Sequence, residues 1–143
     1  MKYESFSARD TEKIGVLIGG MAKAGNIYTL SGDLGAGKTV LAQGFAMGLG
    51  IREIVSSPTF TIVSEYTTGV MPFYHFDVYR ISDPEEMYEV GLDHYLNGDG
   101  VCLIEWGELI EELLPEDTIR ISIEKDLEKG EDYRVIRIRG DWR

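Results

Sequence analysis

A glycine-rich segment in the first third of the chain constrains the fold more than any other feature. Residues 32–39 read GDLGAGKT and meet the pattern G-x-x-x-x-G-K-[ST] through Gly32, Gly37, Lys38 and Thr39. The short apolar run before this segment predicts a strand over residues 26–31, and the residues after it predict a helix over 38–48. A glycine turn between a strand and a helix is the setting that a phosphate-binding loop requires, so the segment predicts a P-loop.

The chemistry of such a loop follows from its residue types. Glycines allow successive backbone N–H groups to face inward as an anion nest, and the N-terminus of the following helix adds partial positive charge. The ammonium group of Lys38 can reach the β- and γ-phosphates of a nucleotide, and the Thr39 hydroxyl can ligate Mg²⁺. The alternative is a glycine turn that only caps a helix. We expect ATP and Mg²⁺ to bind along the loop and its helix start, at Gly32, Asp33, Leu34, Gly35, Ala36, Gly37, Lys38, Thr39 and Val40.

The rest of the pattern predicts an α/β fold. Residues 10–23 are typical of a helix whose inner face carries Ile14, Leu17, Ile18 and Met21. Alternating or compact apolar runs predict strands over residues 3–6, 59–66, 71–76, 101–104, 119–124 and 133–139, and short helices are expected from residue 83 and over 107–114. We therefore expect residues 1–143 to form a single-domain P-loop NTPase, with a mixed central sheet, helices on both faces and antiparallel hairpins.

Two acidic residues stand where apolar strands end. Asp77 follows the run 73–76, and Glu105 follows the run 101–104. Open α/β sheets bind ligands at the carboxyl ends of their strands, and a P-loop needs a carboxylate there to hold Mg²⁺ or orient the attacking water. We therefore expect Lys38, Asp77 and Glu105 to be catalytic and Thr39, Asp77 and Glu105 to hold the metal. Which acid binds the metal and which orients water is left open, as are a turn-capping role for Asp77 and a surface role for Glu105.

Several other residues carry two interpretations. Thr59 and Thr61 are either a switch that senses the γ-phosphate or threonines chosen for a strand entry. Trp106 either packs in the core or lies over a nucleotide or partner. The two histidines, His75 and His94, match no metal-binding spacing, so core or surface roles are expected for them.

Composition restricts the partners and the compartment. The formal net charge is −11, with 25 acidic against 14 basic residues, which disfavours strong direct binding to nucleic acid. The arginines near the C-terminus, at 134, 137, 139 and 143, are interpreted as a solvated strand face, although a local basic face stays open. One cysteine, Cys102, is expected to be a small buried residue, and with no apolar run near the roughly 18 residues of a membrane span we expect a cytoplasmic protein.

Four strings together resemble one bacterial family. They are GDLGAGKT at 32–39, SPTFT at 57–61, HFDVYR at 75–80 and IEW at 104–106. In order and spacing, from about residue 10 to 115, the chain resembles the TsaE (formerly YjeE) family of tRNA threonylcarbamoyladenosine biosynthesis. The P-loop alone is shared by many families, whereas its combination with the other three strings is specific.

The resemblance implies a function and assigns residues to it. It implies an ATPase that supports the TsaB–TsaD complex, which places a threonylcarbamoyl group on the adenosine beside the anticodon of tRNA. It further implies that tRNA is contacted only indirectly and that hydrolysis is weak without the partner proteins. The residues implied are Lys38 and Thr39 at phosphate and Mg²⁺, Thr59 and Thr61 in a switch-like segment, Asp77 and Glu105 as functional acids, Trp106 beside them, and Thr11 with Glu12 at a helix start near the base.

Two other functions compete with this one. A small-molecule kinase would use the same loop, but it usually needs an acceptor domain and an arginine-bearing lid, and Arg52 and Arg80 are isolated in the sequence. A nucleotide-sensing module that does not hydrolyse ATP is the second alternative, because P-loop proteins are often slow until a partner completes the site.

Overall fold

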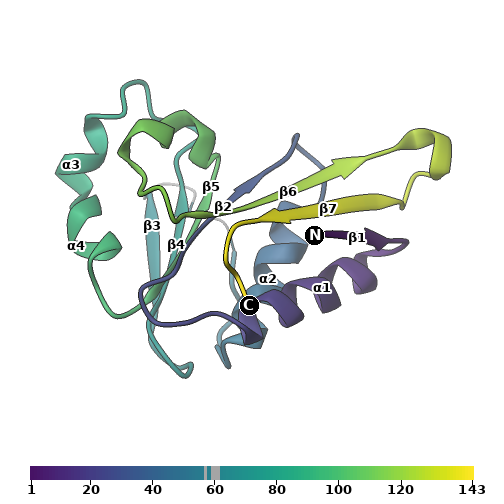
Figure 1. Cartoon of the computed structure of the whole chain (residues 1–143), viewed down its shortest axis with the longest axis horizontal. Coiled ribbons are helices and arrows are strands. Elements are labelled where there is room, and N and C mark those ends of the chain that lie inside the picture. Colours follow the sequence, from purple (N-terminus) through teal and green to yellow (C-terminus); the bar gives the residue numbers. More distant parts are fainter. Residues whose placement is uncertain (57, 59–61) are drawn as a thin grey trace.

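The structure of the chain, a computed structural model, describes residues 1–56, 58 and 62–143. Its centre is a seven-stranded sheet with the order β1-β7-β6-β2-β5-β4-β3 (Figure 1). The strands are β1 Lys2–Ser5, β2 Ile27–Ser31, β3 Val63–Tyr66, β4 Phe73–Asp77, β5 Val101–Glu105, β6 Ile119–Lys125 and β7 Arg134–Arg139. The helices are α1 Ala8–Gly20, α2 Lys38–Gly48, α3 Glu86–Val90 and α4 Leu92–Leu96, with 3₁₀ segments η1 Gly107–Leu113 and η2 Leu127–Lys129.

The sheet is mixed, as predicted. Strand β2 pairs in parallel with β5 on one side and β6 on the other, and β4 pairs in parallel with β5. The neighbours β3–β4, β6–β7 and β1–β7 are antiparallel. The four mutually parallel strands therefore end at one edge of the sheet, which is where the loop after β2 begins.

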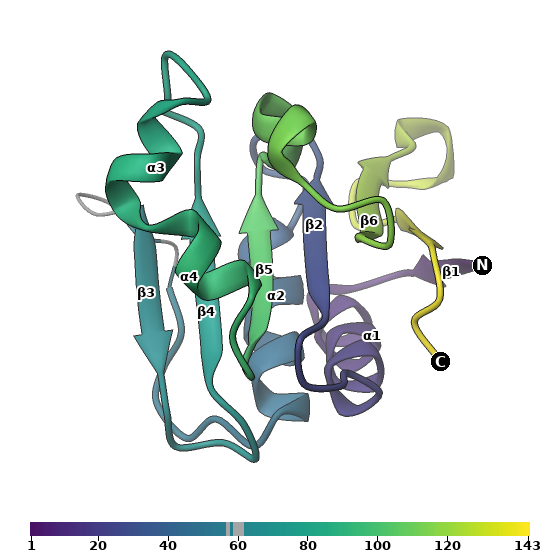
Figure 2. The same cartoon turned by 60° about the vertical axis from the view of Figure 1, so that its left-hand side comes forward.

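Helices cover both faces of the sheet (Figure 2). Alternation along each strand sends one set of side chains toward α1 and α2 and the other toward α3, α4 and η1. On β5, Leu103 joins the large cluster under α1 and α2, whereas Cys102 and Ile104 join the second cluster with Met87 of α3 and Leu92 of α4. Cys102 is buried, as expected, and burial raises the pKa of its thiol to about 12.

The expected inner face of the first helix is partly wrong. Ile18 is fully buried, but Leu17 and Met21 are 45% and 39% exposed. Glycines decide the packing, because α1 and α2 approach backbone to backbone. A Cβ added at Gly19 would lie 2.0 Å from the Phe45 carbonyl oxygen, and one added at Gly44 would lie 2.1 Å from the Glu12 carbonyl oxygen. A pattern that counts only large apolar residues misses this contact, because the closest surface has no side chains to count.

Most element boundaries agree with the sequence. Helix α2 has the predicted bounds, and α1 begins after Ser7, whose Oγ accepts a hydrogen bond from the Asp10 N–H at 3.1 Å. α1 ends at Gly20, earlier than the predicted residue 23. The strand predicted over 59–66 is seen as β3 from Val63, and residues 59–61 lie outside the described ranges. No helix within those ranges has the length and hydropathy needed to cross a membrane.

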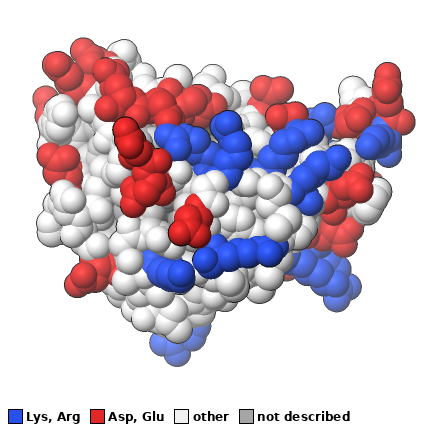
Figure 3. Space-filling model, in the orientation of Figure 1, with Lys and Arg blue, Asp and Glu red and all other residues white. Residues whose placement is uncertain are grey.

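The negative charge is concentrated in one segment of the chain, residues 81–117. Between residues 81 and 117, which include α3, α4, β5 and η1, the chain has twelve Asp and Glu and no Lys or Arg. The remaining residues carry thirteen acidic and fourteen basic side chains. Figure 3 shows this division, with Asp and Glu gathered over the α3 and η1 end of the face and Lys and Arg over β6 and β7. Residues 81–117 therefore carry the excess of negative charge, and the remaining residues are close to neutral.

Candidate functional site

The glycine-rich segment forms the turn from β2 into α2. At two positions of this turn the backbone leaves room only for glycine. Gly37 has φ 107°, a left-handed conformation that L side chains rarely adopt, and it stands at the N-cap of α2. A Cβ at Gly32 would lie 2.6 Å from the Ile123 carbonyl oxygen of β6, so a larger residue would push the loop off the sheet. The pattern G-x-x-x-x-G thus meets a steric need at both ends of the turn.

The N-terminus of α2 is open toward the loop. In the described chain, no side chain caps this helix, and its first turn contains no acidic residue. Its first N–H groups therefore keep their capacity to donate, and the helix dipole adds partial positive charge at the same place. This combination has the chemistry to bind an anion such as phosphate.

Lys38 is the first residue of α2 and is 7% exposed. Its ammonium group donates to the carbonyl oxygens of Gly32 and of Asp33, the latter at 3.2 Å. It also lies 4.2 Å from the centroid of the Trp106 ring, a cation–π distance. The Lys38 side chain therefore folds back over its own loop, where its ammonium group could contact a ligand bound in the loop.

The two predicted acids face the loop from adjacent strands. Asp77 at the end of β4 is paired in register with Glu105 at the end of β5. Both side chains line a pocket of about 430 Å³ together with Lys38, Thr39 and Trp106. The structure thus brings together the three residues that the sequence singled out as catalytic, although they come from three different elements.

Asp77 is held in a half-buried position. Its Oδ1 accepts a hydrogen bond from the Tyr79 N–H at 3.0 Å. Burial raises the pKa of Asp77, and the negative charge of Glu105 raises it further, while the Tyr79 N–H and the charge of Lys38 lower it in part. A carboxyl with a raised pKa gains most from a cation or a proton placed beside it.

Glu105 is almost fully buried, at 2% exposure. Its Oε2 lies 2.6 Å from Nε2 of His75, which is itself 0% exposed. The next residue, Trp106, takes a left-handed conformation with φ 63°. The chain therefore turns sharply after the strand, and the carboxylate of Glu105 is left at the wall of the pocket.

A second pocket of about 240 Å³ adjoins the other end of the loop. It shares Gly35 and Gly37 with the first pocket and is also lined by Thr11, Val40 and Arg134. Thr11 is 2% exposed and its hydroxyl is within 2.7 Å of the Ser5 hydroxyl, so its side chain is already engaged in the fold.

Arg134, from the distant strand β7, is attached to the phosphate loop. Its Nε donates to the Ala36 carbonyl oxygen at 2.7 Å, and its Nη1 donates to the carbonyl oxygens of Glu131 and Tyr133 at 2.7 and 2.8 Å. This contact ties the loop to the C-terminal hairpin. The interpretation of the C-terminal arginines as a solvated strand face fits Arg137 and Arg139, which are exposed, but not Arg134.

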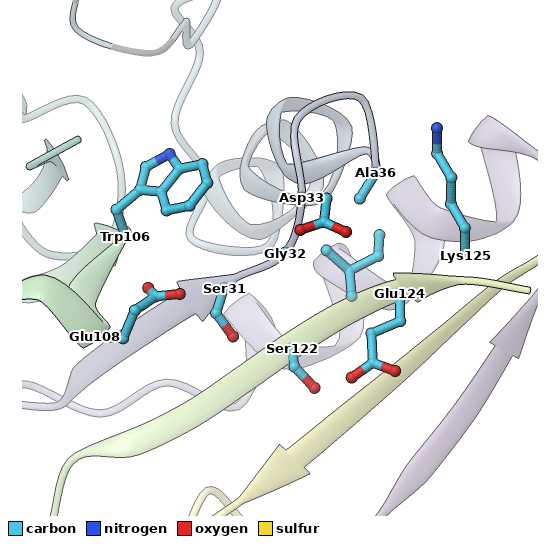
Figure 4. A pocket seen from close by; sticks show the side chains of 10 residues that line it. Ser31, Gly32, Asp33, Ala36, Trp106, Glu108, Ser122, Glu124 and Lys125 are labelled. Carbon is cyan, nitrogen blue, oxygen red and sulfur yellow. The ribbon is translucent and has the colours of Figure 1, made fainter.

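A third pocket, of about 410 Å³, lies on the β6 flank of the loop (Figure 4). Asp33, Glu108, Glu124 and Lys125 line it, and the indole of Trp106 stands at one side. Asp33 therefore lies apart from the pair Asp77 and Glu105. Trp106 lines both pockets and contacts Tyr79 at a tilt of 45°, with ring centroids 4.8 Å apart. It therefore lies between the two pockets, and it also packs, partly buried, against the second core cluster.

The predictions for Thr59 and Thr61 fall outside the described residues and stay predictions. The other predicted site residues fall into three groups. Gly35, Gly37, Lys38, Thr39, Asp77, Glu105 and Trp106 meet at one pocket, together with Leu34, whose side chain is 71% exposed. Thr11, Ala36 and Val40 line the adjoining pocket, and Gly32 and Asp33 line the flank.

The donor set fits a magnesium nucleotide. An open helix start, one ammonium group, one threonine hydroxyl and two carboxylates line or adjoin a single pocket. Mg²⁺ prefers oxygen ligands and usually keeps waters and substrate phosphates among them, so a site with few protein ligands suffices. Within the described ranges, no group of three or more His, Cys, Asp and Glu residues could hold a metal ion by itself, so phosphate oxygens would have to complete the site.

Known proteins similar to this chain belong to one family. The family described as threonylcarbamoyl adenosine biosynthesis protein TsaE matches residues 5–135. The tRNA threonylcarbamoyladenosine biosynthesis protein TsaE of Bacillus subtilis (strain 168) is 50% identical over 136 residues, covering 95% of this chain and 83% of the relative. The chain belongs to the TsaE family.

Two further matches support this placement. The TsaE protein of Treponema pallidum (strain Nichols) is 43% identical over 123 residues, with 86% and 90% of the two chains covered. A crystal structure of Bacillus subtilis YdiB has a TM-score of 0.78 at 44% identity, covering 95% of this chain and 82% of that one. The resemblance seen in the four sequence strings is therefore confirmed, and so is the α/β fold.

Two residues of this TsaE family member were not singled out for the site by sequence reasoning. His75 lies in the core, as was expected for it, and there it contacts Glu105 of the site. Arg134 was grouped with the exposed arginines, yet it holds the phosphate loop. His75 had a signal, because it precedes Asp77 by two residues and so must share its face of β4. Arg134 had none, since nothing local relates it to a loop 98 residues away.

Proposed function

We propose that this TsaE family member binds Mg-ATP at the phosphate loop and hydrolyses it. The observation that carries the proposal is the shared pocket of Lys38, Thr39, Asp77 and Glu105. A lysine for the phosphates, a hydroxyl for the metal and strand-end carboxylates are the groups that phosphoryl transfer to water requires. Nucleotide binding alone would not need two acids beside the lysine.

Each residue has a distinct part in this proposal. The N–H groups at the start of α2 bind phosphate oxygens, and Lys38 exchanges its carbonyl partners for the β- and γ-phosphates. Thr39 and one of the two acids hold the metal, which would neutralise charge on the phosphates. The other acid orients the attacking water. Thr11, Val40 and Arg134 line the adjoining pocket, to which we assign the base of the nucleotide.

We further propose that ATP turnover supports the TsaB–TsaD complex in forming threonylcarbamoyladenosine next to the anticodon of tRNA. Support comes from membership of the TsaE family and from the role in tRNA threonylcarbamoyladenosine biosynthesis that its relatives are named for. The twelve acidic side chains of residues 81–117, with no Lys or Arg among them, disfavour a direct contact with tRNA at that surface. Slow turnover of the isolated chain is expected, since partners often complete such sites.

A reconstitution tests this proposal. Mg-ATP binding and hydrolysis are measured on the chain alone and after mixing with TsaB and TsaD, and complex formation is followed by size-exclusion chromatography. Binding, complex formation and faster hydrolysis in the mixture are expected. Absence of both complex formation and ATP hydrolysis would overturn the proposal, and ATP-dependent phosphorylation of a nucleoside or sugar would favour a kinase instead.

A further inference from the structure

A buried histidine stands behind the site. His75 lies on β4 with its ring 0% exposed, two residues before Asp77 on the same face. The register places it beside Leu103 of β5 and Ser64 of β3. Its ring stacks on Phe73 with centroids 5.9 Å apart and an interplanar angle of 15°. Packed among these strands, the imidazole has little freedom to rotate.

One ring nitrogen is used and the other is not. Nε2 lies 2.6 Å from Glu105 Oε2, whereas Nδ1 is buried and has no hydrogen-bond partner in the described chain. An ionised carboxylate only accepts hydrogen bonds, so Nε2 carries the proton and donates. The neutral Nε2–H tautomer leaves Nδ1 as a bare acceptor, which is cheaper to bury than an N–H without a partner.

An unsatisfied buried nitrogen needs an explanation, and the geometry supplies one. If His75 served only to fill the core, an apolar side chain would do so equally well and would bury no unpaired nitrogen. His75 instead keeps Nδ1 buried without a partner in the described chain, while Nε2 contacts the Glu105 carboxylate at the pocket wall. The contact runs from a rigid strand to the acid, so it restricts where the carboxylate can point.

We propose that His75 is a positioning residue, whose Nε2–H holds the Glu105 carboxylate in the orientation that the phosphate pocket uses. The consequence for turnover rests on the proposed function, whereas the hydrogen bond itself does not. A displacement of about 1 Å in a reacting group can cost about 100-fold in rate. Loss of His75 should therefore reduce the rate of the chemical step more than it reduces nucleotide binding.

The hydrogen bond is tested by NMR of the histidine side chains, without ATP. The chain has only two histidines, His75 and His94, and the exposed His94 serves as an internal reference. We expect a protonated Nε2 and an unprotonated Nδ1 for His75, with an Nε2 proton that exchanges slowly and shifts in Glu105→Gln. A protonated Nδ1, or an Nε2 proton that exchanges as fast as that of His94, would overturn the proposal.

The effect on turnover is tested with three variants in the presence of TsaB and TsaD. His75→Leu removes the donor, and we expect kcat to fall about 10-fold or more while the affinity for Mg-ATP changes by less than about 3-fold. His75→Gln keeps an N–H at a similar reach and should restore most of kcat. His94→Leu is the matched control and should behave like the parent chain.

A double-mutant comparison separates positioning from a general structural role. In a Glu105→Gln background, the change His75→Leu should have almost no further effect on kcat, because the group that it orients is already altered. An equal fold-loss in both backgrounds would overturn the proposal, and so would a kcat unchanged by His75→Leu. If His75→Leu does not fold, His75→Gln and the NMR measurement decide. A parent chain that binds no nucleotide would instead overturn the proposed function and leave the NMR result to judge the hydrogen bond.

Discussion

The N-termini of α1 and α2 lie near the same pocket but are built in opposite ways. At the start of α1, the Ser7 hydroxyl accepts from the Asp10 N–H at 3.1 Å, and the Asp10 carboxylate accepts from the Phe6 N–H at 3.0 Å. At the start of α2, the N-cap is Gly37, the first residue is Lys38, and no described side chain caps the helix.

The start of α1 therefore contributes to the stability of the fold, whereas the start of α2 is open to a ligand. Both helices present unpaired N–H groups and partial positive charge at their first turn. In α1 the Ser7 hydroxyl satisfies one of those groups, the Asp10 N–H, and the Asp10 carboxylate adds a negative charge in the first turn, which stabilises the fold. In α2 the N–H groups are left for a ligand, and a lysine replaces the acid that would neutralise the dipole. Substitutions at the two ends, and at the acids opposite α2, should therefore have different consequences.

The largest effect is expected for Lys38→Ala. The variant loses the ammonium group that would pair with the β- and γ-phosphates, so affinity for Mg-ATP should fall about 100-fold or more. Its free energy of unfolding should change by only about 1 kcal/mol, since the ammonium group donates to carbonyl groups of its own loop and otherwise makes a cation–π contact with Trp106. Isothermal titration calorimetry and thermal denaturation measure the two quantities. Lys13→Ala, on the exposed side of α1, is the control, and equal affinity losses in the two variants would contradict the comparison.

Glu105→Gln should have an effect of comparable size, on turnover and not on affinity. Turnover should fall by about 100-fold to 1,000-fold, while affinity for Mg-ATP changes by less than about 3-fold, because the carboxylate acts on water or metal and not on the phosphate nest. Single-turnover hydrolysis in the presence of partners measures the effect. Glu108→Gln, which alters an acid lining the flanking pocket, is the matched control. A Glu105→Gln chain with normal hydrolysis would refute the assignment.

Ser7→Ala tests the closed helix end. Loss of the cap should lower the free energy of unfolding by about 1 kcal/mol and leave affinity for Mg-ATP within about 3-fold. Chemical denaturation with a two-state fit gives the first value and calorimetry gives the second. Ser7→Asp, which restores a capping oxygen, should recover the stability. If Ser7→Ala weakened binding as strongly as Lys38→Ala, the two helix ends would not have separate roles.

Asp77→Asn should have the smallest effect on stability, and in the opposite direction. Burial raises the pKa of Asp77 above its ordinary value, so the folded state binds its proton more tightly than the unfolded state does. Stability from this group therefore decreases as the pH rises through the region between the ordinary pKa, about 4, and the raised one. At neutral pH, Asp77→Asn should raise the melting temperature by about 2 °C while turnover falls.

The pH dependence provides the control for this prediction. Below the ordinary pKa the aspartic acid is neutral in both states, so the melting temperatures of the two chains should converge. A stabilisation that persisted unchanged at acid pH would exclude the burial of the Asp77 charge as its cause.

Local spacing accounts for much of what the sequence predicted. The P-loop and the bounds of α2 were predicted because strand, glycine turn and helix are adjacent in the chain and each has its own signal. The alignment of Asp77 with Glu105 could also be predicted from the sequence, because parallel strands expose their carboxyl ends at one edge of the sheet. The inner face of α1 was partly missed, since Leu17 and Met21 are apolar but face away from the glycine contact with α2.

The sequence by itself determined the glycine turn between β2 and α2, with Lys38 as the first residue of the helix, because that geometry depends on residues within one turn of backbone. Only the tertiary structure decided what surrounds this turn. Arg134 reaches Ala36 and His75 reaches Glu105 across 98 and 30 residues of chain. Such contacts depend on which strands become neighbours and in which register, and that is settled by burial over the whole core and not by any local pattern.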